Sequence, residues 1–131
     1  MKIGVTGTRT GMNEWQFEQL SSFLTTVFIP GAELHHGDCV GVDVEAGELA
    51  RELGYTIVCH PPTNHKLRAY HNGDKIHEPF GYLARDRNIV DATEMLLVVP
   101  LQVKWSSQGG TWFTHDYAIK QNKPLKIFFP K

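Results

Sequence analysis

The chain has 131 residues, of which 41% are hydrophobic and 21% are charged, and its 13 basic and 14 acidic side chains give a formal net charge of −1. This length predicts a single domain over residues 1–131. The balanced charge argues against nucleic acid as a partner, because a protein that wraps nucleic acid needs a basic face. The two cysteines, Cys39 and Cys59, exclude a disulfide framework and suit a reducing compartment.

The sequence also argues against a membrane protein. The longest apolar run, Met95 to Val99, is far shorter than the ~20 residues that span a bilayer. The first residues, Met1 to Val5, begin directly as a strand and lack the apolar stretch of a signal peptide. We therefore expect a cytoplasmic domain that does not associate with membranes.

Short apolar runs alternate with helical patterns along the first half of the chain. Residues 2–6 are predicted to form a buried strand that ends in a glycine turn. Asn13 is a candidate N-cap for a helix that reaches residue 28. Its apolar residues recur at spacings of three and four and should form one buried face, consisting of Phe17, Leu20, Leu24, Val27 and Phe28.

The same alternation continues to the end of the chain. Further strands are predicted at residues 33–36, 55–60, 95–99 and 125–129, and further helices at residues 43–53, 81–92 and 111–121, with Gly54 ending the first of these helices. Residues 63–80 have no regular period and are too long for an ordinary connection. We expect them to form a functional loop, a lid or a flexible excursion.

Strands that alternate with helices predict an α/β fold. Parallel pairing with right-handed crossovers gives a Rossmann-like, doubly wound sheet of about five mainly parallel strands with helices on both faces. Ligands bind such sheets at the carboxyl ends of the strands, where the strand order reverses. Functional residues are therefore expected in the turns that follow residues 6, 36, 58 and 99.

Glycine turns lead into three of the predicted helices, at residues 7–11, 37–41 and 109–111. Glycine lets the backbone approach a ligand closely, and free amides at a helix start attract phosphate. A tight turn also needs glycine for structural reasons alone, so no single turn is specific. Three turns at one sheet edge favour phosphate binding. The predicted ligand-binding residues are Gly7, Thr8, Arg9, Gly37, Asp38, Gly41, Arg87, Asn88, Gly109, Gly110, Thr111 and Thr114.

Charged side chains near the predicted turns supply further candidates. Residues 85–88, Arg-Asp-Arg-Asn, contain arginines suited to bidentate phosphate binding, although a solvated Asp–Arg pair would explain them as well. Asp38 and Asp43 are candidates for ribose hydroxyls, but Asp43 is better explained as a helix cap. His115 and Asp116 are the acid–base candidates beside the third glycine turn. Asp116 and Arg87 are the candidate catalytic residues.

The seven histidines and two cysteines do not form a metal-binding motif in the sequence. Neighbouring His35 and His36 on a strand should point to opposite faces, which is poor chelating geometry. The chain has no CxxC or HxxxH pair, and the histidines of residues 63–80 fit no zinc module. We therefore predict no metal site and no cofactor.

Four segments, in this order, resemble the SLOG superfamily of Rossmann-like nucleotide-binding domains. They are MKIGVTGTR at residues 1–9, GDCVGVD at 37–43, Arg87-Asn88, and GGTWFT at 109–114. The superfamily includes the DNA-processing protein DprA, the LOG proteins and small YspA- and YpsA-related proteins. The chain is most similar to the YspA-like type, which bacteria and phages often encode. The resemblance implies that the glycine turns bind a nucleotide or a nucleotide-derived ligand.

The resemblance also supplies an enzymatic alternative. LOG enzymes cleave the N-glycosidic bond of nucleoside monophosphates, using a Pro-Gly-Gly-x-Gly-Thr-x-x-Glu motif and an upstream arginine. By position, Arg87 resembles this arginine, and Gly109, Gly110 and Thr114 resemble the phosphate cradle. The position of the catalytic glutamate holds Tyr117 here, with Asp116 one residue out of register.

Because no carboxylate fits the catalytic position, the leading hypothesis is a binding domain. It would hold a nucleotide-type small molecule as a sensor or sequestering protein. A nucleotide N-glycosidase, or phosphoribohydrolase, of LOG type is the alternative, and DprA-like DNA binding is a weaker one. Apolar helix residues such as Phe17, Phe23 and Phe28 also leave a homo-oligomer open.

Overall fold

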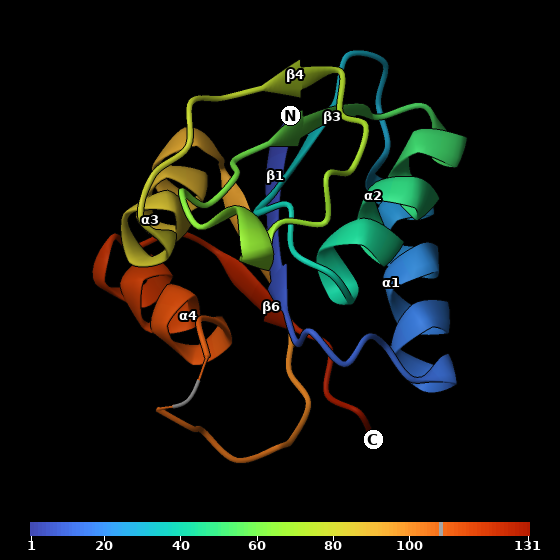
Figure 1. Cartoon of the computed structure of the whole chain (residues 1–131). Coiled ribbons are helices and arrows are strands. Elements are labelled where there is room, and N and C mark those ends of the chain that lie inside the picture. The colour runs from blue at the N-terminus through green and yellow to red at the C-terminus, as the bar shows by residue number, and fades with distance from the viewer. Residues whose placement is uncertain (108) are drawn as a thin grey trace.

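A computed structural model describes residues 1–107 and 109–131 (Figure 1). Gln108, the last residue of the polar segment that follows the strand at 95–99, lies outside the described residues. The strands form one parallel sheet with the order β4-β3-β2-β1-β5-β6. Their bounds are β1 Lys2–Gly7, β2 Glu33–His36, β3 Thr56–Cys59, β4 Lys75–Ile76, β5 Met95–Val99 and β6 Leu125–Ile127.

Helices cover both faces of the sheet, as the alternating pattern predicts. Their bounds are α1 Glu14–Val27, α2 Val42–Leu53, α3 Tyr82–Ala92 and α4 Thr111–Lys120. In Figure 1, α1 and α2 lie on one side of the sheet and α3 and α4 on the other. Strand β5 serves both layers, because Leu97 and Val99 pack toward α1 and α2 whereas Leu96 and Val98 pack toward α3 and α4.

Helix α1 begins as its sequence predicts. The Asn13 side chain accepts a hydrogen bond from the Gln16 amide at 2.8 Å, and the Gln16 side chain accepts one from the Asn13 amide at 3.1 Å. Gln16 is buried, because its side-chain amide donates to the carbonyl oxygens of Pro100 and Phe128. Phe17, which was expected on the buried face, is 45% exposed. The buried face of α1 consists of Gln16, Leu20 and Leu24, and Phe17 projects from the helix in a different direction.

The sheet has six strands rather than about five, because residues 63–80 contribute β4 and a short 3₁₀ helix at His65–Leu67. Strand β4 extends the edge of the sheet beside β3, with Val58 opposite Lys75. Asp74 fixes this register, since its carboxylate accepts from the Ile57 amide at 2.7 Å. This segment is therefore anchored along the sheet edge rather than extending freely from it.

The strand order reverses between β1 and β5. From β1 the chain builds outward through β2, β3 and β4, and then returns to place β5 and β6 on the other side of β1. Parallel pairing sets Gly7 beside Val99 at the carboxyl ends of these two central strands. No helix within the described residues is long and apolar enough to cross a membrane.

Candidate functional site

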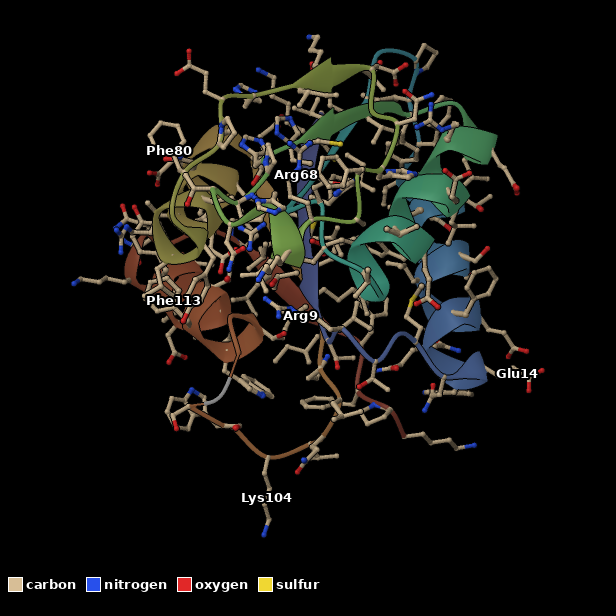
Figure 2. All side chains as sticks on the ribbon, viewed as in Figure 1. Arg9, Glu14, Arg68, Phe80, Lys104 and Phe113 are labelled. Carbon is tan, nitrogen blue, oxygen red and sulfur yellow. The ribbon has the colours of Figure 1, made fainter. Side chains whose placement is uncertain are left out.

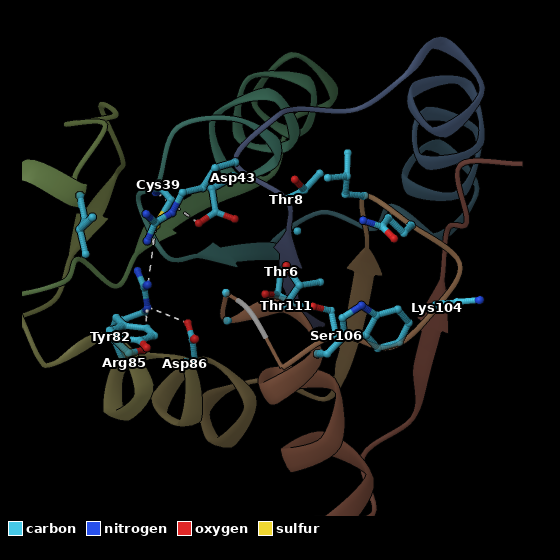
Figure 3. A pocket seen from close by; sticks show the side chains of 18 residues that line it. Thr6, Thr8, Cys39, Asp43, Tyr82, Arg85, Asp86, Lys104, Ser106 and Thr111 are labelled. Atoms are coloured by element: carbon cyan, nitrogen blue, oxygen red, sulfur yellow. Dashed lines mark hydrogen bonds and ion pairs between the residues drawn. The ribbon is translucent and has the colours of Figure 1, made fainter.

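A cleft of about 510 Å³ opens at the carboxyl ends of β1 and β5 (Figure 3). Its lining includes residues 6–9 at the end of β1, parts of the segment 101–112 that follows β5, and the first turn and a half of α3, together with Cys39, Asp43 and Leu67. This is the point where the strand order reverses, which is the usual place for a ligand in an open parallel sheet.

Half of the predicted ligand-binding residues line this cleft: Gly7, Thr8, Arg9, Gly109, Gly110 and Thr111. The two groups come from turns about a hundred residues apart in the sequence, so the fold has brought them together. Helix α4 begins at Thr111, and its first-turn amides have no partners within the helix. These amides and the partial positive charge of the helix start favour an anion.

Gly110 allows α4 to begin against α3. A Cβ atom at this position would lie 2.6 Å from Oδ2 of Asp86, so any other residue would displace either the Asp86 carboxylate or the helix start. Thr114, another predicted ligand residue, is buried and does not line the cleft. Its hydroxyl donates to the Gly110 carbonyl oxygen at 2.6 Å, so it supports the turn from behind.

The second glycine turn, at residues 37–41, supports the cleft without presenting its first amides to a ligand. The amides of Gly37 and Cys39 donate to Oδ2 of Asp43 at 2.9 and 3.3 Å, and the Asp38 amide donates to Nδ1 of His36 at 2.9 Å. Asp43 is therefore not the helix cap that was expected. It lies in the first turn of α2, whose N-cap is Gly41, and its buried carboxylate binds the preceding turn.

Asp38 and Gly41 also have structural positions. The Asp38 carboxylate is buried and points into the connection between β3 and α3, residues 61–80, which is called segment 61–80 below. There it accepts hydrogen bonds from Nε of Arg68 and from the His71 amide, both at 2.8 Å. Gly41 has φ +89°, and a Cβ there would lie 2.5 Å from the Arg9 carbonyl oxygen. Because glycine has no Cβ, the start of α2 packs closely against the loop that follows β1.

The structure does not bring the remaining predicted residues to the cleft. Arg87 is exposed on α3, and its guanidinium carbon lies 5.9 Å from the Phe113 ring centroid. Neither Arg87 nor Asn88 lines the cleft. The exposed Asp116 does not line it either, and its carboxylate accepts from Nε1 of Trp105 at 2.9 Å.

Arg85, rather than Arg87, is the arginine of α3 that reaches the cleft. It is 4% exposed, and its Nε lies 2.7 Å from Oδ1 of Asp86. The Nη1 group donates to the carbonyl oxygens of Gly37 and His60. The sequence-based prediction chose Arg87, by its resemblance to the LOG arginine, and did not include Arg85 among the ligand residues. Helical periodicity distinguishes them, because Arg85 lies four residues before the buried Ile89 whereas Arg87 faces the opposite side.

The floor of the cleft contains two buried carboxyl groups on either side of this arginine. Burial raises the pKa of Asp43 to about 7 and that of Asp86 to about 6, while the positive charge of Arg85 opposes both shifts. Near neutral pH the floor therefore carries little net negative charge. Arg9, beside the end of β1, is a further cationic residue of the cleft lining. Lys104, on the loop after β5, also lines the cleft, but its side chain extends away from the body of the protein (Figure 2).

Comparison with known proteins identifies the fold. The molybdenum cofactor carrier protein of Chlamydomonas reinhardtii is 24% identical, with a TM-score of 0.68 over 96% of this chain and 74% of that protein. The molybdenum cofactor binding protein of Rippkaea orientalis is 21% identical, with a TM-score of 0.69 over 96% and 74%. These TM-scores show a shared Rossmann-like architecture.

Single-stranded DNA binding occurs on the same architecture. DNA processing protein A of Helicobacter pylori, described as binding single-stranded DNA, is 21% identical, with a TM-score of 0.65 over 97% of this chain and 64% of that protein. The expectation that nucleic acid is not a partner therefore gains no support from the fold. No family model and no curated protein sequence matches the chain.

Proposed function

We propose that the chain binds a phosphate-bearing small molecule, a nucleotide or a nucleotide-derived ligand, in the cleft between β1 and β5. It would act as a sensor or sequestering domain of the SLOG type. The observation that carries the proposal is the cleft at the strand-order reversal, which both the start of α4 and Arg9 line. Hydroxyl groups of Thr8 and Thr111 add hydrogen-bond donors beside them.

The size and lining of the cleft support a ligand larger than a free anion. A volume of about 510 Å³ lies inside the ~300–1,000 Å³ range of small-molecule sites. Leu67, Tyr82 and Leu101 provide apolar surface at the cleft walls, and Trp112 lines it as well. A phosphate at the α4 start and a planar ring against these side chains would fill the site. The molybdenum cofactor, which two structural neighbours bind, belongs among the candidates.

Isothermal titration calorimetry of the purified chain tests the proposal. The panel contains nucleoside monophosphates, cyclic nucleotides and the molybdenum cofactor. We expect one member to bind at one site per chain. Arg9→Ala should weaken binding by roughly tenfold, since it removes a charge-assisted contact. Lys120→Ala is the matched control, because Lys120 is exposed on α4 and does not line the cleft.

Two outcomes would refute the proposal. One is the absence of binding to every member of the panel at high micromolar concentration. The other is an equal loss of affinity in Lys120→Ala and in Arg9→Ala, because this would place the anion outside the cleft.

Hydrolysis of an N-glycosidic bond is the second candidate function, and Asp86 is the observation in its favour. Its carboxyl group lines the cleft, is buried, and has a pKa raised to about 6, which suits proton transfer near neutral pH. Asp116 does not line the cleft. This function predicts release of free base from a nucleoside monophosphate, lost in Asp86→Asn and retained in Asp116→Asn. Binding without base release would exclude it.

A further inference from the structure

A second cluster of reactive side chains lies away from the cleft, where β2 and β3 end beneath segment 61–80. It consists of His36 at the end of β2, Cys59 at the end of β3, and His71 in the segment. One potential ligand atom from each of the three residues lies within 4.8 Å of the other two. Nε2 of His36 is 3.0 Å from Nδ1 of His71 and 3.6 Å from Sγ of Cys59.

The fold builds this cluster from three separate parts of the chain. Parallel pairing of β2 and β3 sets His36 directly opposite Cys59. Asp38 then holds the third residue in place, because its carboxylate accepts a hydrogen bond from the His71 amide. The sequence pattern missed the cluster, since ligand spacing along one segment cannot reveal a pair formed across two strands.

Two glycines leave the space that the three side chains occupy. A Cβ atom at Gly47, inside helix α2, would lie 2.6 Å from Cε1 of His71 and 3.1 Å from Nε2 of His36. A Cβ atom at Gly73 would lie 2.5 Å from Sγ of Cys59. Glycine in a helix interior destabilises the helix relative to alanine, so its presence here requires a packing or functional reason.

We propose that His36, Cys59 and His71 bind a transition-metal ion of the Zn²⁺ class. Imidazole nitrogen and thiolate sulfur are the donors that Zn²⁺ prefers, whereas Mg²⁺ and Ca²⁺ require oxygen. Glu48 completes the arrangement, because its carboxylate lies 2.5 Å from Nε2 of His71 and orients Nδ1 toward the other two residues. Three protein ligands leave a fourth position of the metal open to water or another ligand.

Metal binding requires a defined movement of protons. Without metal, the Asp38 amide donates to Nδ1 of His36, so the His36 proton resides on Nε2 and points at Nδ1 of His71. Coordination by Nε2 moves this proton to Nδ1, and the Asp38 amide must then turn away. The thiol proton of Cys59 passes to solvent as the metal–sulfur bond forms. One proton is released per metal ion, and the turn at residues 37–38 is rearranged.

Titration of the full chain, purified without a histidine tag and treated with a chelator, tests the site. We expect one Zn²⁺ per chain by competition with a chromophoric chelator. Co²⁺ in its place should give a thiolate-to-metal charge-transfer band. Cys59→Ser and His71→Ala should each weaken binding at least tenfold. The control is His65→Ala, an exposed histidine of the same segment outside the cluster, which should bind like the unchanged chain.

The Co²⁺ spectrum of the chain without substitutions tests the site independently of the variants, so the result does not depend on whether each variant folds. The Asp38 amide resonance should also shift on saturation with Zn²⁺, because this amide must leave Nδ1 of His36. The proposal is overturned by any of three results. These are no stoichiometric Zn²⁺ binding, a Co²⁺ complex without the charge-transfer band, or unchanged affinity in both Cys59→Ser and His71→Ala.

Discussion

Replacing Arg85 with methionine removes the positive charge from the floor of the cleft while keeping most of the side-chain volume. In the native protein this guanidinium donates to two carbonyl oxygens and forms an ion pair with Asp86. It also opposes the effect of burial on the pKa of Asp43. The variant must therefore keep two carboxyl groups buried without their compensating charge.

The cost of this change follows from the ionisation of the two carboxyl groups. Removing one partner of a buried ion pair costs about 3–5 kcal/mol of unfolding free energy. The pKa of Asp43 is raised to about 7 and that of Asp86 to about 6. At pH values between the ordinary pKa of an aspartate and these raised values, the folded state therefore binds more protons than the unfolded state. Both carboxyls are ionised in the native protein at about pH 8 and protonated at about pH 5. The loss caused by Arg85→Met should be largest at the higher pH and should shrink at the lower pH.

Urea unfolding at about pH 8 and about pH 5 measures this difference. Arg87→Met is the matched control, because Arg87 is an exposed arginine of the same helix, and it should change stability by no more than ~0.5 kcal/mol. Adding Asp86→Asn to Arg85→Met should recover part of the loss at the higher pH. An equal loss at both pH values, together with no recovery in the double variant, would refute this view of the cleft floor.

Three further predictions concern the cleft and helix α1. Affinity for a cyclic nucleotide should rise a few-fold as the pH falls from about 8 to about 5.5, because Asp43 and Asp86 become neutral while the phosphodiester keeps its charge; calorimetry that finds a constant or falling affinity would contradict this. Gly110→Ala should weaken the same binding by tenfold or more, since its Cβ would lie 2.6 Å from the Asp86 carboxylate and must displace either this carboxylate or the α4 start, both of which line the cleft; native affinity in this variant would show that neither contributes to ligand binding. Asn13→Ala should cost about 1 kcal/mol and lower Tm by roughly 3–5 °C through loss of the capping box, whereas Asn13→Asp, which keeps a capping oxygen, should not; calorimetric unfolding separates the two.

The sequence predicted the sheet and most of its helices because their signals are local. Alternating apolar runs identified five of the six strands, and residues such as Asn13 and Gly54 identified helix ends by their cap chemistry. Strand β4 has two exposed residues, which is too short to show any periodicity. Phe17 was misplaced because apolar spacing alone cannot anticipate that a glutamine will be buried by two carbonyl partners.

The site was predicted less completely, because contacts between distant segments decide which side chains face the cleft. The turns at Thr8 and Gly110 were identified through their glycines, and both line the cleft. The turn at Gly37 has the same sequence character, yet its amide is occupied by Asp43. That pairing depends on how α2 meets the strand ends, and glycine content carries no information about it.

The pairing of β1 with β5 determines when, during synthesis and folding, the cleft can form. Gly7 and Val99 are neighbours in the sheet but stand more than ninety positions apart in the chain. A nascent polypeptide therefore has no place to hold a ligand until its C-terminal third has emerged and docked. Long-range closure of this kind is slow compared with local helix formation. A ligand that binds between β1 and β5 would therefore bind only the folded protein and would stabilise it against unfolding.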